Sequence, residues 1–182
     1  MSSIAVAERL HIHHQTILKC VDHVRNKGYR TYTLDEDYFD VIDTSNKAYI
    51  LGLLYADGCN HLEQHSISIS LQEGDVKILQ RISDELKSNK PLEFLPPRSH
   101  SINGRECNCQ PQYRLRVNSA HLSGRLNELG LVKRKTLVLE FPTFLDENLV
   151  PHFIRGYMDG DGGIYAYNRK HMESLHHQVV IT

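Results

Sequence analysis

Two nine-residue segments of similar sequence constrain this chain more than any other feature. ILGLLYADG occupies residues 50–58 and IRGYMDGDG occupies residues 154–162, an offset of 104 positions. Aligned on each other, they match at two small residues and at a closing Asp-Gly pair. A repeat at this distance predicts two duplicated half-domains.

Small residues recur four positions apart in each segment, Gly52 with Ala56 and Gly156 with Gly160. This spacing leaves a flat strip on one side of a helix, where a second backbone can approach closely. Glycine inside an exposed helix costs about 1 kcal/mol relative to alanine, so its repeated use needs a packing reason. We therefore expect both segments to be helices that pack on each other through these strips.

Each segment ends with an acid and a glycine, Asp57 with Gly58 and Asp161 with Gly162. Carboxylates at helix C-termini are disfavoured by about 0.3–1 kcal/mol. If the strips pack together, Asp57 and Asp161 lie side by side, and two carboxylates beside two carbonyl ends repel each other. A hard divalent cation with oxygen ligands, above all Mg²⁺, relieves this repulsion. We expect the two glycines to cap the helices and the two acids to share the metal.

The sequence between the repeats predicts helices and strands in alternation. Thr44 or Ser45 is a natural N-cap for a helix that runs to Asp57, and residues 65–71 alternate between apolar and small polar side chains, as a half-buried strand does. The remaining predicted elements are an amphipathic helix from Asp75 to about Asn89, strands within 92–100 and 112–119 joined by a polar loop at 101–109, and a helix over 120–129 that ends at Gly130.

The two repeats and the pattern between them resemble the LAGLIDADG homing endonucleases. The segments LNELGLVKRKT and PHFIRGYMDGDGGI are similar to the lead-in to the second motif of that family. The resemblance implies an α+β fold built from αββαββα half-domains, whose four-stranded saddle lies in the DNA major groove. It also implies that Asp57 and Asp161 are catalytic metal ligands for Mg²⁺. The expected function is site-specific hydrolysis of phosphodiester bonds in double-stranded DNA.

The chain departs from the family pattern in two places. Tyr55 stands where the first motif of the family carries its first Asp, whereas the second motif keeps Asp159. Only 20 residues follow Gly162, so we expect the second half-domain to be mostly missing and cleavage by this chain to be weak or absent. A C-terminally truncated monomeric enzyme is the preferred interpretation. A decayed reading frame and a partner, either a complementing second half or a second copy, are the alternatives.

The chain divides into four predicted regions. A small helical segment at 1–28 precedes a linker at 29–45, a first half-domain at 46–150, and the second motif helix with the start of its half-domain at 151–182. Ala7, His11 and Ile17 have the spacing of a helix-turn-helix, although His11 stands where that turn usually has glycine. A helical hairpin without DNA contact is the alternative for this segment.

Basic residues in the middle third are the predicted DNA contacts. The net charge of −1 means that affinity for phosphates must come from the distribution of charge. Arg114 and Arg116 alternate with apolar residues, which makes one face of their predicted strand basic. The complete set of predicted DNA-binding residues is Arg114, Arg116, Arg98, Arg105 and Lys135.

Composition narrows the class of protein. Hydrophobic residues make up 40% and charged residues 24% of the chain, and no apolar run approaches the roughly 20 residues that span a bilayer. With no signal-peptide pattern and four scattered cysteines, we expect an intracellular protein, cytoplasmic or nucleoid-associated. Cys107 and Cys109 with His100 would make half of a zinc site, but no second half accompanies them, so a plain loop is favoured.

Two other functions share this fold, a non-cutting DNA-binding regulator and an RNA-splicing maturase. The acid pair discriminates between the candidates, because a regulator can lose it while a nuclease cannot. Both acids are present, which favours the nuclease. The residues of intein splicing are not visible, so a free-standing or intron-encoded origin is preferred.

Overall fold

The computed structural model describes residues 9–10, 30–102, 105–133, 135, 138–168 and 175–181. The chain forms two compact units, residues 1–31 and residues 32–182. The predicted helix-turn-helix positions Ala7, His11 and Ile17 lie outside the described residues. All the elements considered below belong to the second unit.

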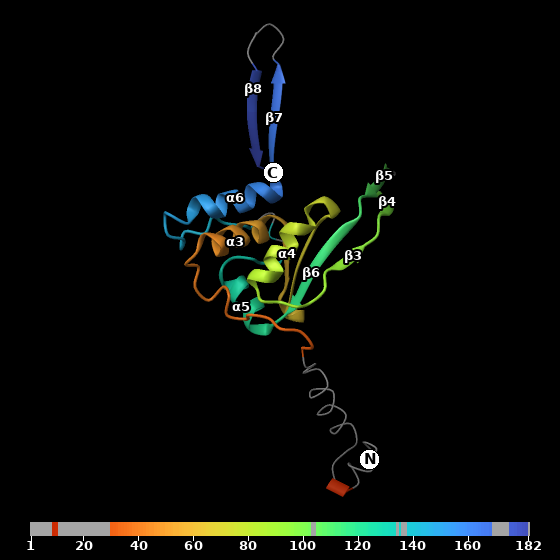
Figure 1. Ribbon diagram of the computed structural model, residues 1–182, viewed down its shortest axis with the longest axis vertical. Coiled ribbons are helices and arrows are strands. Elements are labelled where there is room, and N and C mark those ends of the chain that lie inside the picture. The colour runs from red at the N-terminus through yellow and green to blue at the C-terminus, as the bar shows by residue number, and fades with distance from the viewer. Residues whose placement is uncertain are drawn as a thin grey trace. The chain divides into compact units, whose positions relative to one another are not determined.

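The second unit contains both helices and strands (Figure 1), which confirms a mixed α+β fold. In chain order its elements are α3 (Ser45–Asp57), β1 (Gly58–His61), the 3₁₀ helix η1 (Leu62–Gln64), β2 (Ser66–Gln72), the 3₁₀ helix η2 (Glu73–Asp75), α4 (Val76–Glu85), β3 (Glu93–Leu95), β4 (Arg98–Ile102), β5 (Arg105–Cys109), β6 (Gln112–Asn118), α5 (Ala120–Glu128), α6 (Val150–Asp161), β7 (Gly162–Asn168) and β8 (Leu175–Ile181).

Four strands form one antiparallel sheet in the order β1-β2-β6-β3. Opposed residues in a ladder point to the same face of a sheet. One row across the sheet runs from Cys59 to Ser68 to Arg116 on the polar face. The pairs flanking that row, such as Ile69 with Leu115, point to the opposite face and are buried.

The hydrophobic core lies between that apolar sheet face and the helices. The α3 helix begins at Thr44, whose side chain accepts a hydrogen bond from the Lys47 amide, and this start agrees with the predicted cap. The strongly amphipathic helices α4 and α5 contribute their apolar faces to the same cluster as α3. Its fully buried members include Phe39, Leu51, Leu53, Leu79, Leu122, Leu126, Leu131 and Val117.

The prediction of a polar loop at 101–109 is wrong. Most of it belongs to a second, two-stranded sheet in which β4 pairs with β5. This hairpin is held by backbone pairing, and its sequence lacks the apolar alternation by which strands are recognised. The preceding strand is interrupted at Pro96 and Pro97, since proline has no amide hydrogen for a ladder.

The α4 helix is shorter than predicted and ends at Glu85. Lys87 then adopts a left-handed φ of 48°, and the Ser88 amide donates back to the Ser83 carbonyl at 2.8 Å. These contacts turn the chain before Pro91, so the apolar spacing that continued to Leu86 overstated the helix length.

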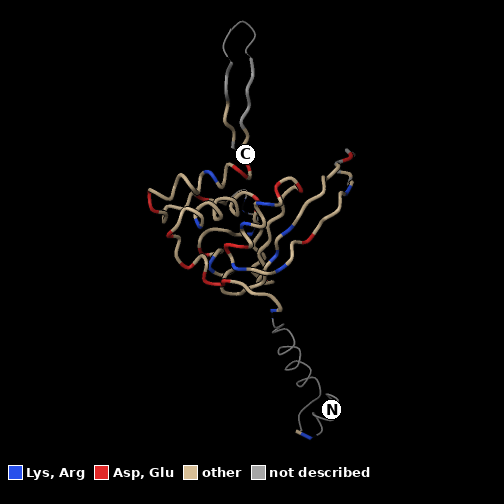
Figure 2. Tube along the Cα trace, viewed as in Figure 1, with Lys and Arg blue, Asp and Glu red and all other residues tan. Residues whose placement is uncertain are grey.

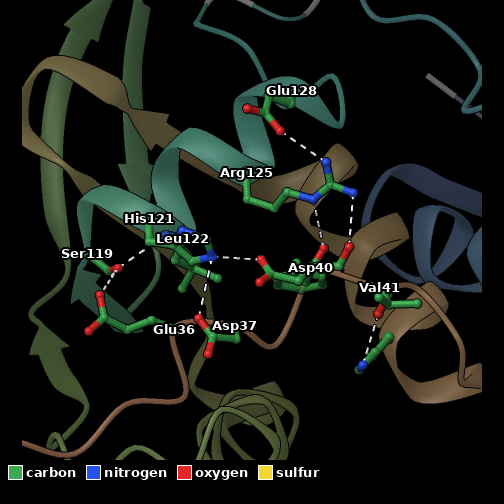
Figure 3. A network of polar contacts seen from close by, with 11 residues as sticks. Glu36, Asp37, Asp40, Val41, Ser119, His121, Leu122, Arg125 and Glu128 are labelled. Atoms are coloured by element: carbon green, nitrogen blue, oxygen red, sulfur yellow. Dashed lines mark hydrogen bonds and ion pairs between the residues drawn. The ribbon is translucent and has the colours of Figure 1, made fainter.

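The segment that leads into α3 is docked on α5 through polar contacts (Figure 3). Arg125 donates from Nε to the Phe39 carbonyl at 3.2 Å and from Nη2 to the Asp40 carbonyl at 3.1 Å. His121 Nε2 lies 2.7 Å from Asp40 Oδ1, and Ser119 Oγ donates to the Glu36 carboxylate. Phe39 itself is only 1% exposed, so the predicted linker 29–45 supplies part of the core.

The two repeat helices differ sharply in burial. In α3, eight of its residues are buried, whereas in α6 only Phe153 and Gly156 are. Ile154 remains 43% exposed.

No helix in the described part of the chain combines the length and the apolar character needed to cross a membrane.

The close contact between α3 and α6 is made by glycine. A Cβ on Gly52 would overlap the Phe153 carbonyl oxygen, and a Cβ on Gly156 would overlap the Tyr49 carbonyl oxygen. A Cβ on Gly160 would overlap that of Ala56. The structure thus brings together the four small residues of the two predicted strips.

We expect Gly156→Ala to destabilise the protein by about 3 kcal/mol or more, because its Cβ meets rigid backbone and the helices must separate. Gly124→Ala is the matched control. Gly124 lies in α5 with nothing within 4 Å of an added Cβ, so alanine there should stabilise by about 0.5–1 kcal/mol. Urea unfolding of both variants measures the difference, and equal effects would contradict the close-contact interpretation.

Candidate metal centre and nucleic-acid interface

The acids of the two repeats occupy the last positions of α3 and α6. Gly58 and Gly162 follow them as C-caps with extended φ values of −73° and −89°. Glycine is needed for a steric reason, since a Cβ on Gly58 would overlap the Leu54 carbonyl oxygen. Each acid is therefore fixed at the point where its helix turns directly into a strand.

The Asp57 carboxyl group lies against the other helix. A Cβ on Gly160 would come within 2.9 Å of Asp57 Oδ2, and Asp161 is the next residue. Burial raises the pKa of Asp57, the negative charge of Asp161 raises it further, and Lys135 partly opposes both. Asp57 still reaches solvent, so the pair is accessible from outside.

Lys135 supplies positive charge beside the acid pair. Its Nζ donates to the carbonyl oxygens of Leu54, Ala56 and Gly58 at 2.9, 2.6 and 2.8 Å. Burial lowers the pKa of Lys135, while the charges of Asp161 and Asp57 raise it. The ammonium group thus stabilises the negative end of α3, where the Leu54 carbonyl also accepts from the Gly58 amide and the carbonyls after it cannot bond within the helix.

These residues fit a divalent cation. Two carboxylates and two helix C-termini meet at one place, and the single ammonium of Lys135 balances only part of that negative charge. Carboxylate oxygens are the ligands that Mg²⁺ prefers in proteins. Asp57 and Asp161 are the residues that could hold such an ion.

The polar face of the four-stranded sheet carries the predicted basic residues of β6. Arg114 donates from Nε to Ser70 Oγ at 3.1 Å, and its Nη1 lies 3.8 Å from Glu93 Oε2. Arg116 stands in the transverse row that begins at Cys59, two residues after Asp57. Strands are about 4.8 Å apart, so Arg116 lies roughly two strand spacings from the start of that row.

The other predicted DNA contacts are dispersed. Arg98 is exposed in β4, at the base of the second hairpin. Arg105 lies in β5 opposite Ile102, and its side chain is outside the described part of the structure. Lys135 lies with the acids instead of on the sheet face. The structure therefore places Arg114 and Arg116 on one surface, and Arg98 and Lys135 elsewhere.

A second titratable cluster joins Asp37, Asp40 and His121, which offer ligand atoms within 4.8 Å of one another. All three are exposed, and Figure 3 shows the imidazole between the two carboxylates. The hydrogen bond to Asp40 is the largest influence raising the pKa of His121. A protonated imidazole bound to carboxylates accounts for this arrangement without a metal.

Comparison with solved structures finds LAGLIDADG homing endonucleases at low similarity. One structure is described as the I-LtrWI LAGLIDADG homing endonuclease bound to target DNA, with 12% identity, a TM-score of 0.39 and coverage of 79% of this chain and 65% of that chain. Another, the LAGLIDADG meganuclease I-AabMI bound to uncleaved DNA, has 18% identity, a TM-score of 0.37 and coverage of 72% and 63%. This chain therefore spans less than two thirds of either protein. No family model and no curated protein matches the sequence.

We expect Lys135→Met to destabilise the protein by about 2–4 kcal/mol, because it removes the ammonium donor shared by three carbonyls and leaves the acids without their nearby cation. Lys133→Met is the matched control. Lys133 pairs with Glu63 at 3.3 Å with both side chains mostly exposed, so its loss should cost at most about 1 kcal/mol. Denaturant unfolding at neutral pH separates the two cases, and a similar small loss for both would show that Lys135 is not structural.

The raised pKa of Asp57 predicts a pH effect on stability. Between the ordinary value of 3.8 and the raised folded pKa, the folded chain binds more protons than the unfolded chain. In metal-free buffer the contribution of Asp57 is therefore destabilising at neutral pH and disappears as the pH falls through this window. Asp57→Asn should raise the free energy of unfolding at pH 7 and leave it unchanged near pH 3. Thermal unfolding in EDTA measures this difference, and a lower stability of the variant at pH 7 would contradict it.

Proposed function

We propose that this chain is a site-specific double-stranded DNA endonuclease of the LAGLIDADG type that depends on Mg²⁺. The observation that carries the proposal is the meeting of Asp57 and Asp161 at the ends of two helices in backbone contact, where the pKa of Asp57 is raised. Repelling carboxylates kept together at this cost suit a metal-dependent reaction better than a structural role.

In this proposal Asp57 and Asp161 hold the ion from opposite helices. A bound divalent cation supplies Lewis-acid stabilisation of the charge that develops on the phosphodiester. Lys135 keeps the end of α3 in place and limits the repulsion between the acids through its contacts with three carbonyls. The glycine contact fixes the separation of the two helices and with it the spacing of the carboxylates.

The polar sheet face is the proposed DNA surface. It starts at β1, immediately after Asp57, and carries Arg114 and Arg116 two positions apart on the same side of β6. Phosphate contacts by Lys and Arg position a duplex, and the groove edges are read by neighbouring side chains. The serines at positions 66 and 68 of β2 are buried on this side of the sheet, and Ser70 accepts the hydrogen bond from Arg114.

Replacement of either acid tests the reaction. We expect slow Mg²⁺-dependent nicking or cleavage of long duplex DNA by the unaltered chain, and a loss of about 100-fold or more in Asp57→Asn or Asp161→Asn. Duplex binding in EDTA should stay nearly unchanged, because neither amide removes a positive charge. Asp159→Asn, which changes the exposed acid that accepts a 2.9 Å hydrogen bond from Tyr49, is the control and should retain the activity.

The outcomes separate the candidate functions. Cleavage that persists in Asp57→Asn or Asp161→Asn would exclude the proposed centre. Duplex binding without any cleavage, both by the unaltered chain and by the chain supplemented with a complementing second half, would favour a non-cutting DNA-binding protein. Binding to structured RNA alone would favour a maturase.

A further inference from the structure

Two basic groups lie near each other at one end of the sheet, and Glu93 offsets their charge only in part. Lys90 is in the connection from α4 to β3, and Arg116 is on β6. Burial is the largest cause that lowers the pKa of Lys90, and the positive charge of Arg116 lowers it further. The negative charge of Glu93 raises this pKa, by less than the other two causes lower it. Neither group forms an ion pair with any residue that the structure describes.

The surroundings of Arg116 differ from those of Arg114, two positions away. Arg114 has Glu93 and Ser70 as partners. Arg116 has a buried Nε with no hydrogen-bond acceptor in the described part of the chain. A buried Nε without an acceptor is costly in a folded protein. Because that atom is itself buried, an acceptor from outside would meet the Nη groups of this half-buried side chain.

Tyr32 ties Lys90 to the strand that carries Arg116. The Lys90 Nζ lies 5.0 Å from the centroid of the Tyr32 ring, a cation–π distance. The Tyr32 hydroxyl oxygen accepts a 2.6 Å hydrogen bond from the amide of Asn118, the last residue of β6. Next to Tyr32, the Thr33 amide donates to Asn89 Oδ1 at 2.8 Å. The ammonium group is therefore positioned before any ligand arrives.

We propose that Lys90 and Arg116 together bind one backbone phosphate of duplex DNA, with Tyr32 as the residue that positions Lys90. The inference rests on the proposed function, because it takes the duplex as the source of the phosphate. Both side chains are donors only, and phosphate oxygens are acceptors that carry the missing negative charge. Figure 2 shows Lys and Arg positions along the region of β6 and β3, the surface on which the duplex is proposed to lie. Contacts of this type fix the register of the duplex and do not read its sequence.

Salt dependence of binding measures the number of phosphates neutralised. Binding of a mixed-sequence duplex by Lys90→Gln, Arg116→Gln and the double variant is followed by fluorescence anisotropy in EDTA at several salt concentrations. Each single variant should lower the slope of log K against log salt by about 0.9 or less. The double variant should also lose about one phosphate equivalent in total, since both groups share a phosphate. Tyr32→Leu should weaken binding in the same direction but by less than Lys90→Gln.

Lys77→Gln is the matched control. Lys77 is exposed on α4, the helix that packs on the apolar side of the sheet, so its loss should leave the slope unchanged. Circular dichroism of each variant verifies the fold. A Lys90→Gln slope equal to that of Lys77→Gln, or a loss of two equivalents in the double variant, would overturn the shared phosphate while leaving the proposed endonuclease intact. Failure of the unaltered chain to bind duplex DNA would overturn both.

Discussion

The backbone contact between α3 and α6 is the constraint on which the rest of this structure depends. Gly52 and Gly156 each face a carbonyl oxygen of the other helix with no space for a side chain. Two helices that cross this closely bring their C-terminal ends together, and each end carries an acid. The packing of the helices therefore causes the repulsion between the two carboxylates, because the contact itself brings Asp57 close to Asp161.

The distribution of charge follows from that contact. Negative charge collects where the helices end, and Lys135 offsets part of it by donating to two carbonyls of α3 and to that of the cap residue Gly58. The cations of β6 lie on the adjoining polar face of the sheet, outside this cluster. A net charge of −1 therefore conceals two neighbouring surfaces of opposite sign. Such a pairing suits the proposed ligand, a polyanion that is held close to the proposed cation-binding acids.

Much of this arrangement follows from the sequence, because its strongest signals are steric. Small residues four apart predicted the helix contact, and the alternation in residues 65–71 predicted the central strand β2. The β4–β5 hairpin was not predictable, since it is built from polar residues and held by backbone pairing. The contacts of Lys135 were equally hidden. The basic residues around Lys135 suggested a contact with phosphate. Its actual partners at the end of α3 are distant in the sequence, and only the tertiary structure brings them to Lys135.

The two repeat helices make the same backbone contact, but α3 is buried in the core to a much greater extent than α6. In α3 the contact is one side of a helix that is buried on its other sides against the sheet and α4, whereas α6 buries little besides Phe153 and Gly156. Helices of this length gain most of their stability from tertiary packing. The position of Asp161 therefore depends largely on the glycine contact itself, while Asp57 is held by the whole core. The geometry of the acid pair is thus set from one side, and the second acid is placed against α3 and its sheet.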